Sequence, residues 1–363
     1  MARKLKPDRI LFFVTLILVG FGIAMVFSSS AIIGKERFGD PSYFSLKQII
    51  AATLGLAVMF VVMKVDYHFY RHPAVVFSVL GVVVALLVMV FFLAAAANTH
   101  RWIQLPGFNI QPSELAKLAL ILFLAYFLEK RKSAVNQFAF TLVPIGVIVA
   151  LLAGLIVLQP DLGTAITLLV IAVVLLFVAG LDLRWIAMSI VFAMPVLYLL
   201  IFRVKYRRDR ILAFLDPWAD PLEGGYQIIQ SLISVGTGGL IGLGYMEGKQ
   251  KLFYLPEAHT DFIYAVVGEE LGLIGTFGVL ILFLIFLWRG LRASMRAPDQ
   301  FGFYLALGIT MMICIQAFIN MSVVLGLLPT KGIPLPFLSY GGSSFVVMLA
   351  GVGILLNVSQ QSS

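Results

Sequence analysis

The residues best suited to chemistry lie in "LPEAHTDFIYAVVGEELG", residues 255–272. Asp261 stands where this polar segment enters a long apolar run. A carboxylate at the mouth of a low-dielectric cavity can have its pKa raised towards neutrality, so Asp261 is a candidate general base that removes a proton from a hydroxyl group. The alternative is that Thr260 or Asp261 caps the following helix. Glu269 and Glu270, two turns further on, are expected to be structural or to line a cavity, because a carboxylate inside a membrane needs a partner or water.

A second candidate pair is Glu114 and Lys117 in "QPSELAKLAL", residues 111–120. Ser113 fits an N-cap position, and the two charges are three residues apart on one face of the helix that would follow. Buried together, they would form a structural ion pair or line a polar cavity in which Lys117 meets an anionic group of a ligand. The cavity is the favoured interpretation, because charges inside a membrane are usually functional.

A cluster of cations follows the apolar run that ends at residue 202, in "RVKYRRDR". Guanidinium groups bind phosphate oxygens in a bidentate manner, so the cluster suits the diphosphate of a lipid-linked substrate. The alternative is an ordinary solvated surface, because a long loop is exempt from the charge rule for membrane topology. The cations are Arg203, Lys205, Arg207, Arg208 and Arg210.

Two further segments contain prolines and polar groups. In "LQPDLGTA", residues 158–165, Asp161 is expected mainly to cap the next helix. The prolines of "LPTKGIPLPFLSYGGSS", residues 328–344, prevent a regular helix, and irregular backbone at membrane depth is tolerated only against protein or water. We therefore expect this segment to help form the wall of a cavity, with Lys331, Ser343 and Ser344 as polar contacts.

Membrane-spanning helices must position these residues. The chain has 363 residues, of which 61% are hydrophobic and 12% charged, and its mean hydropathy is +1.02; a soluble domain has roughly 25% charged residues. We predict an all-α polytopic membrane protein, a bundle of about ten transmembrane helices in one domain over residues 1–363. The first run is expected to be an uncleaved helix rather than a signal peptide. The predicted spans are residues 10–28, 46–63, 74–96, 115–128, 138–158, 162–180, 185–202, 262–288, 303–328 and 337–356.

The distribution of Lys and Arg near the span ends predicts the orientation of the bundle. With the N-terminus in the cytoplasm, the short outer loops contain only Lys35, Arg37, Arg101 and Lys331. Both termini are therefore expected in the cytoplasm, and the net charge of +8 is largely a topology signal that implies no nucleic-acid partner. The inner cations are Arg3, Lys4, Lys6, Arg9, Lys64, Arg71, Lys130, Arg131, Lys132, Arg184, Arg289, Arg292 and Arg296.

One long outer connection, residues 203–261, joins the seventh and eighth spans and contains most of the polar chemistry. Its middle could form a short interfacial helix. Its Gly-rich piece, residues 236–244, lacks the Lys-Ser/Thr ending of a P-loop, so a flexible loop is favoured over a nucleotide site. Cys314 is the single cysteine, which excludes a disulfide or a thiolate metal cluster.

In these segments the chain resembles the SEDS family (shape, elongation, division and sporulation) of bacterial cell-wall polymerases. The resemblance covers nearly the whole chain and rests on five stretches in the family's order. Two of them, "PEAHTDFI" and "PTKGIPLPFLSYGGSS", are closer in wording to the division members than to the elongation members. The five stretches are "RWIQLPGFNIQPSELAKLAL", "LQPDLGTA", "DPWADPLEGGYQIIQSLISVGTGGLIGLG", "LPEAHTDFIYAVVGEELG" and "GLLPTKGIPLPFLSYGGSS".

The resemblance implies a peptidoglycan glycosyltransferase that polymerises lipid II at the outer face of the bacterial cytoplasmic membrane and releases undecaprenyl diphosphate, in cell division or elongation. The family's essential aspartate maps onto Asp261, and its functionally important glutamate and lysine map onto Glu114 and Lys117. The substrate and cavity residues expected with them are Arg101, Arg203, Arg207, Arg208, Arg210, His259, Lys331, Ser343 and Ser344.

The resemblance also implies partners and an ion. The partners are a single-pass class B penicillin-binding protein, which supplies the transpeptidase, and other membrane proteins of the divisome or elongasome. The resemblance implies a divalent cation, Mg²⁺ or Mn²⁺, and no organic cofactor. The sequence identifies no ligand set for this cation. Two alternatives remain open from the residues: a transporter that flips lipid II across the membrane, and a non-catalytic scaffold for a penicillin-binding protein.

Overall fold

Each apolar run predicted to span the membrane is a helix in the structure, a computed structural model that describes residues 6–93, 101–105, 108–131 and 134–361. The predicted third span extended to residue 96, and its last three residues lie outside the described ranges, as do Arg3, Lys4 and Lys132. The helices that correspond to the ten predicted runs are α1 (Arg9–Phe38), α2 (Tyr43–Lys64), α3 (Pro73–Met89), α4 (Pro112–Lys130), α5 (Val143–Leu158), α6 (Leu162–Val178), α7 (Leu183–Phe202), α10 (Ile263–Met295), α11 (Gln300–Val324) and α12 (Gly342–Gln361).

Within the described residues, eight helices are long and apolar enough to cross a membrane, and α6 is a shorter apolar helix. The helix α4 contains four charged residues, Glu114, Lys117, Glu129 and Lys130, and is buried on nearly every side. The all-α class is confirmed. The exception is a small antiparallel hairpin between β1 (Ile103–Leu105) and β2 (Phe108–Ile110), in which Ile103 pairs with Ile110.

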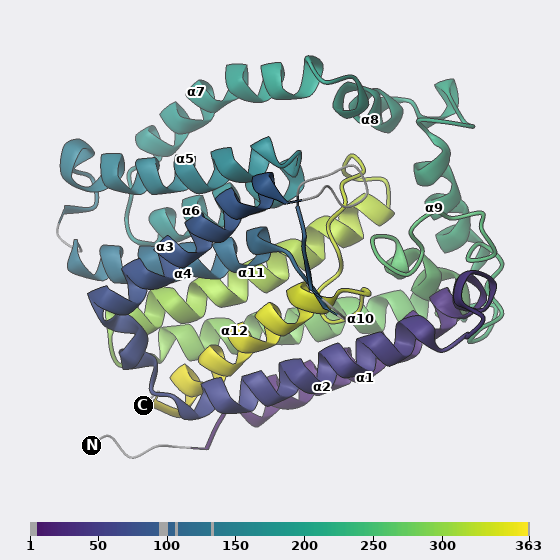
Figure 1. Ribbon diagram of the computed structural model, residues 1–363, viewed down its shortest axis with the longest axis horizontal. Helices are drawn as coiled ribbons and strands as arrows, with labels where there is room; N and C mark the ends of the chain where they lie inside the picture. The colour runs from purple at the N-terminus through teal and green to yellow at the C-terminus, as the bar shows by residue number, and fades with distance from the viewer. Residues whose placement is uncertain (1–5, 94–100, 106–107, 132–133, 362–363) are drawn as a thin grey trace.

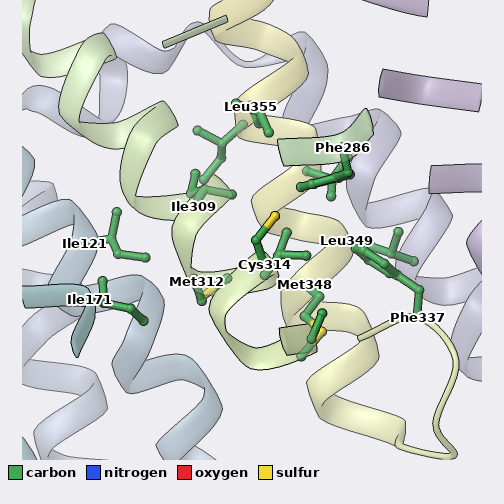
Figure 2. Close-up of a cluster of buried hydrophobic side chains, with 14 of the residues drawn as sticks. Ile121, Ile171, Phe286, Ile309, Met312, Cys314, Phe337, Met348, Leu349 and Leu355 are labelled. Carbon is green, nitrogen blue, oxygen red and sulfur yellow. The ribbon is translucent and has the colours of Figure 1, made fainter. Parts of the chain in front are cut away.

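The core lies where α4, α6, α10, α11 and α12 meet (Figure 2). Ile121 of α4 and Ile171 of α6 face Ile309 and Met312 of α11, and the single cysteine, Cys314, is buried in the same apolar cluster. The helix α12 packs along α2, and α10 packs against α1 and α11. By contrast, no residue of α7 is buried, and this helix arches over the bundle beside α8 (Figure 1).

The start of α1 and the end of α12 lie at the same end of the bundle (Figure 1). There the backbone N–H of Asp8, before α1, donates to Ser359 near the end of α12 at 3.1 Å. Asp261, which precedes α10, lies at the opposite end of that long helix from Arg289. Both termini were predicted on one side of the membrane and Asp261 on the other, and these positions at opposite ends of the bundle agree with that prediction.

The long connection before α10 is largely ordered, in contrast to a simple loop. It contains α8 (Lys205–Leu215), the 3₁₀ turn η5 (Pro217–Ala219) and α9 (Tyr226–Thr237). The short helix predicted in its middle is α9, which buries Ile228 and Ile229. Shorter turns elsewhere are η1 (Tyr67–Arg71), η2 (Val90–Phe92) and the π-helical η4 (Phe138–Leu142) that leads into α5.

The Gly-rich piece was predicted to be flexible, and this prediction is wrong. Four backbone hydrogen bonds of 2.9 to 3.2 Å join residues 239–244 to residues 269–274 of α10. At Gly272 the helix breaks, with φ 62° and ψ −157°. A Cβ on Gly272 would lie 2.4 Å from the backbone nitrogen of Gly242, and one on Gly242 would lie 2.1 Å from the carbonyl oxygen of Glu270. Glycines are therefore required on both sides because the two backbones touch.

Candidate functional site

A cavity of about 320 Å³ lies at the Asp261 end of the bundle. Five separate parts of the chain form it: the segment before β1, the turn into α6 with the start of that helix, the end of α7 with α8, the segment before α10, and the turn between α11 and α12. Its charged residues are Arg101, Asp161, Arg207, Arg210, Asp261 and Lys331, and its remaining lining includes Tyr206, Thr330 and Gly332. Asp261 therefore shares one cavity with four cations.

The Asp261 carboxylate is available for chemistry. The residue is half-buried, and no described residue donates a hydrogen bond to its side chain or forms an ion pair with it. The helix-cap alternative is wrong, because the N-cap of α10 is Phe262 and no side chain caps that end. Thr260 instead donates to the Glu257 carboxylate at 2.8 Å.

The surroundings of Asp261 suit a base that works near neutral pH. Burial, the largest cause, and the charge of Glu257 together raise the pKa of Asp261 to about 7, although Arg210 acts in the opposite direction. The backbone of Gly332 closes one side of the carboxylate, since a Cβ at this glycine would lie 3.2 Å from Asp261 Oδ2. A carboxylate with such a pKa is partly ionised at neutral pH and accepts a proton more readily than an ordinary aspartate.

Two of the four cations are held by hydrogen bonds to the protein, whereas Arg210 lies only over the ring of Tyr206, with its guanidinium 5.6 Å from the ring centroid. Arg101 donates to the carbonyl oxygens of Gln159, at 2.8 Å, and Pro160. Arg207, buried on α8, donates to the carbonyl of Leu200 at 3.0 Å. Among the described residues, Arg210 and Lys331 have neither a hydrogen-bond nor an ion-pair partner for their charged groups. Burial lowers the pKa of Lys331, so an anion in the cavity would stabilise its charged form.

The remaining predicted cations lie outside the cavity lining. Arg203 and Arg208 are exposed, and Arg208 lies 3.6 Å from Asp209 in an exposed ion pair. The helical turn explains the division of the cluster, because Arg207 and Arg210, three residues apart, share one face of α8.

Asp161 lines the cavity, although the sequence predicted for it mainly the role of a helix cap. Capping is confirmed, since its carboxylate accepts from the backbone N–H of Thr164 at 3.1 Å and from its hydroxyl at 2.9 Å. The same carboxylate accepts from the side chain of Gln111 at 3.2 Å. The backbone N–H of Gln111 donates to the Ser343 hydroxyl at 3.0 Å. Ser343 and its buried neighbour Ser344 thus lie behind the wall of the cavity rather than in its lining.

Glu114 and Lys117 form a buried ion pair that does not line this cavity. Lys117 Nζ lies 2.9 Å from both oxygens of Glu114 and donates to Gln316 on α11 at 2.6 Å. The Gln316 amide in turn donates to the carbonyl of Pro334 at 3.0 Å. The pair is therefore connected to the turn that contains Lys331 and supports the cavity from behind.

His259 also lies outside the lining. Its ring packs against Phe44 and Tyr340, with centroids 4.9 and 5.9 Å away, and burial lowers its pKa. Its backbone carbonyl accepts from the N–H of Tyr340 at 2.9 Å. His259 thus joins the segment before α10 to the start of α12.

Glu269 and Glu270 are structural. Glu269 accepts from the backbone N–H groups of Lys249 at 2.7 Å and Gln250 at 3.2 Å. Glu270 forms a buried ion pair with Lys251 at 2.5 Å and accepts from the Ser28 hydroxyl at 2.6 Å. These two acids therefore fix the segment that leads to Asp261. The partner of Glu270, Lys251, had no signal in the sequence.

The arrangement combines one free carboxylate with several cations at a membrane surface. Such a site can deprotonate a hydroxyl and bind a phosphate group at the same time. Among the described residues, no three His, Cys, Asp or Glu side chains come close enough to hold a metal ion by themselves.

Comparison with known proteins identifies similar chains. The FtsW, RodA and SpoVE family model, described as a cell cycle protein, matches residues 8–363. The probable peptidoglycan glycosyltransferase FtsW of Geobacter metallireducens is 49% identical over 355 residues, which is 98% of this chain and 95% of that protein. Stage V sporulation protein E of Bacillus subtilis is 43% identical over 361 residues, 99% of each chain. A solved chain from a peptidoglycan synthase complex that coordinates polymerization and crosslinking matches with a TM-score of 0.80 and 30% identity, over 97% of both chains.

Proposed function

The chain belongs to the FtsW, RodA and SpoVE family of cell cycle proteins, and we propose that it carries out its reaction in the cavity around Asp261. It is a multi-pass membrane protein and a peptidoglycan glycosyltransferase, as its motifs predicted. The observation that carries the proposal is the free carboxylate of Asp261, which shares its cavity with Arg101, Arg207, Arg210 and Lys331.

In the proposed reaction, the Asp261 carboxylate removes the proton from the GlcNAc 4-hydroxyl of an incoming lipid II. The oxygen attacks C1 of the MurNAc at the reducing end of the growing glycan, and a new C–O bond forms with inversion. The bond from C1 to the phosphate oxygen breaks, and undecaprenyl diphosphate leaves with the bonding electrons. A diphosphate leaves without protonation, so the cavity needs only one acid–base residue.

The cations stabilise the leaving group. Among the described residues, the charged groups of Arg210 and Lys331 have no hydrogen-bond or ion-pair partner, although Arg210 lies over the Tyr206 ring. These two cations can therefore bind the diphosphate oxygens, while Arg101 and Arg207 are already oriented. Charges fixed in a partly buried site stabilise developing negative charge without rearranging during the reaction.

A divalent cation fits this donor set only together with the substrate. Mg²⁺ is typically bound by one or two carboxylates plus phosphate oxygens, and the carboxylates in the cavity lining are Asp161 and Asp261. Asp161 would hold the ion together with the diphosphate oxygens, which leaves Asp261 as the base, and the ion when bound would offset charge on the diphosphate.

The proposed location is the bacterial cytoplasmic membrane, with the cavity facing outward. The start of α1, the end of α12 and the cations Arg289, Arg292 and Arg296 near the end of α10 lie away from Asp261, which supports this orientation. For the partner we propose a single-pass class B penicillin-binding protein, with other divisome or elongasome membrane proteins. This rests on the similarity to a chain of a synthase complex in which polymerization and crosslinking are coordinated.

The test is polymerisation of purified lipid II by the purified protein with its candidate partner, under a penicillin that silences transpeptidation. Glycan strands are expected from the wild type, and none from folded Asp261→Asn or Asp261→Ala. Asp209→Asn removes an exposed carboxylate from α8 and should retain full activity. Full activity in the Asp261 variants would remove this residue as the base. No polymer from any protein, with loss of partner binding in outer-loop variants, would favour the scaffold. Lipid II movement across liposome membranes without polymer from any protein would favour the transporter.

A further inference from the structure

A second cavity, of about 390 Å³, lies at the opposite end of the bundle from Asp261. Three distant parts of the chain form it: the segment before α1, the last turns of α10, and Ser359 near the end of α12. It is strongly basic, with five cations and a single carboxylate, Asp8, in its lining. The cations are Lys6, Arg9, Arg289, Arg292 and Arg296.

Asp8 organises this cavity rather than neutralising it. Its carboxylate accepts from the backbone N–H of Leu11 at 3.0 Å, which caps α1, and from Arg289 Nε at 2.9 Å. Arg289 is thereby fixed, with its guanidinium also over the ring of Trp288 at 5.4 Å. Among the described residues, the other four cations have no ion-pair partner. The site therefore has an excess of unpaired positive charge around a fixed arginine.

The positive-inside rule accounts for cations at this end of the bundle, but not for their convergence on one cavity. Two helices that continue from the cavity into the membrane are apolar and exposed just beyond it. Ile10 and Phe13 of α1 are 46% and 56% exposed, and Trp288 and Leu284 of α10 are 58% and 46% exposed. A ligand that matches this surface has an anionic group outside and hydrocarbon chains alongside.

From this geometry we propose that the cavity binds the phosphate headgroup of an anionic phospholipid in the leaflet next to the chain termini, which the charge distribution predicts to be the cytoplasmic one. Basic pockets between transmembrane helices on the cytoplasmic side bind such headgroups. The lipid would join α1 to α10 at the end of the bundle that does not contain the glycosyl-transfer cavity, so this site is separate from the substrate site.

The test is lipid retention by the full-length protein in detergent, measured by native mass spectrometry with phosphatidylglycerol or phosphatidylcholine of identical acyl chains. The wild type is expected to retain phosphatidylglycerol preferentially. Arg292→Gln with Arg296→Gln should weaken that binding more than tenfold, because each cation near an anionic lipid surface contributes roughly fivefold. Arg292→Lys with Arg296→Lys keeps the charge and should retain most of the binding.

The matched control removes two cations from the same end outside the cavity, with Lys64→Gln at the end of α2 and Arg184→Gln at the start of α7. This variant should retain phosphatidylglycerol as the wild type does. Two competitors identify the ligand: inorganic phosphate and undecaprenyl diphosphate. Displacement of phosphatidylglycerol by inorganic phosphate, or stronger binding of undecaprenyl diphosphate, would overturn the phospholipid assignment. The proposed site would be contradicted if the wild type retained both phospholipids equally. It would also be contradicted if the control variant lost as much phosphatidylglycerol binding as the variant with Arg292→Gln and Arg296→Gln.

Discussion

The side-chain amide of Asn320 donates a 2.7 Å hydrogen bond to the backbone carbonyl of Asp261. The same nitrogen donates to the carbonyl of Ile333 at 2.8 Å. One buried side chain of α11 therefore joins the segment before α10 to the turn that contains Lys331 and Gly332. Asn320 lies outside the cavity lining, so we regard it as a positioning residue that sets the distance between the base and the facing turn.

Replacing Asn320 by leucine should impair catalysis more than folding. Leucine has the same number of side-chain heavy atoms in a similar branched arrangement but cannot donate, so two carbonyls lose their partner and the base is free to shift. A misplacement of about 1 Å can cost on the order of 100-fold in rate, and we expect the kcat for lipid II polymerisation to fall roughly 10- to 100-fold with a smaller change in KM. Asn136→Leu is the control, because this exposed asparagine binds Gly180 and Asp182 far from the cavity. Unchanged kcat in Asn320→Leu would contradict a positioning role.

Polymerisation should depend on pH through Asp261. The base acts when ionised, and with a pKa of about 7 activity is expected to be half-maximal near that pH and to fall about tenfold for each unit below it. The charge of Glu257 raises this pKa, so Glu257→Gln should move the midpoint to lower pH. Initial rates across the pH range measure both effects, with Asp209→Asn expected to keep the wild-type midpoint. A midpoint that Glu257→Gln leaves in place would argue against Asp261 as the titrating group.

Ionisation of Asp261, which activity requires, should lower the stability of the folded protein. Folding raises the pKa of Asp261 from its ordinary value of 3.8 to about 7, so folding favours the protonated form. The stabilising contribution is complete below about pH 4 and is lost as the pH rises through 7. Asparagine resembles the protonated acid, so Asp261→Asn should unfold at a higher temperature than the wild type at pH 8, and the difference should shrink as the pH falls. A lower melting temperature for Asp261→Asn at pH 8 would contradict the raised pKa.

Adding a methyl group at Gly332 should crowd the base. The new Cβ would lie 3.2 Å from Asp261 Oδ2, which obstructs the approach of a sugar hydroxyl without disturbing a helix. We expect Gly332→Ala to lower the polymerisation rate severalfold and Gly332→Val to lower it further, at nearly constant melting temperature. Gly20→Ala, where a Cβ would meet no atom within 4 Å, controls for glycine replacement. Wild-type rates in Gly332→Val would show that the substrate approaches from another side.

The spanning helices were predictable because a bilayer requires long apolar runs, and each run predicted a helix. Their lengths were less predictable: α1 continues to Phe38, ten residues beyond the predicted span. Helix α8 was not predicted because its cation-rich sequence lacks a helical repeat of apolar residues. Its helical form places Arg207 and Arg210 on the face that lines the cavity.

The candidate site was predictable in its residue types but not in its contacts. Asp261 and Lys331 were both singled out, yet their common cavity depends on Asn320 and on the packing of α11. Glu114 and Lys117 were expected to line a cavity, with a structural ion pair as the alternative, and the structure has the ion pair outside the lining of the Asp261 cavity. Its link to the turn runs through Gln316, which has no local motif. Contacts between distant segments leave no trace in a single sequence when the residue that makes them is an ordinary amide.

The buried pair of Lys251 and Glu270 should be essential for stability. Lys251→Met leaves the Glu270 carboxylate buried with hydrogen bonds from Ser28 and the backbone of Met246 but no counter-charge. Loss of one partner of a buried ion pair costs about 3–5 kcal/mol. We expect a large fall in melting temperature in detergent. Activity should be lost with it, because this pair anchors the segment that leads to Asp261.

The double variant Lys251→Met with Glu270→Gln separates the charge from the packing. Neutralising both partners removes the unpaired charge, so it should recover more than half of the lost stability. The exposed pair of Arg208 and Asp209 is the control, because Arg208→Met should cost at most about 1 kcal/mol. A double variant as unstable as the sum of its single changes would show that the two residues act independently. The segment before Asp261 would then be held by Glu269 and the backbone contacts at Gly242 and Gly272.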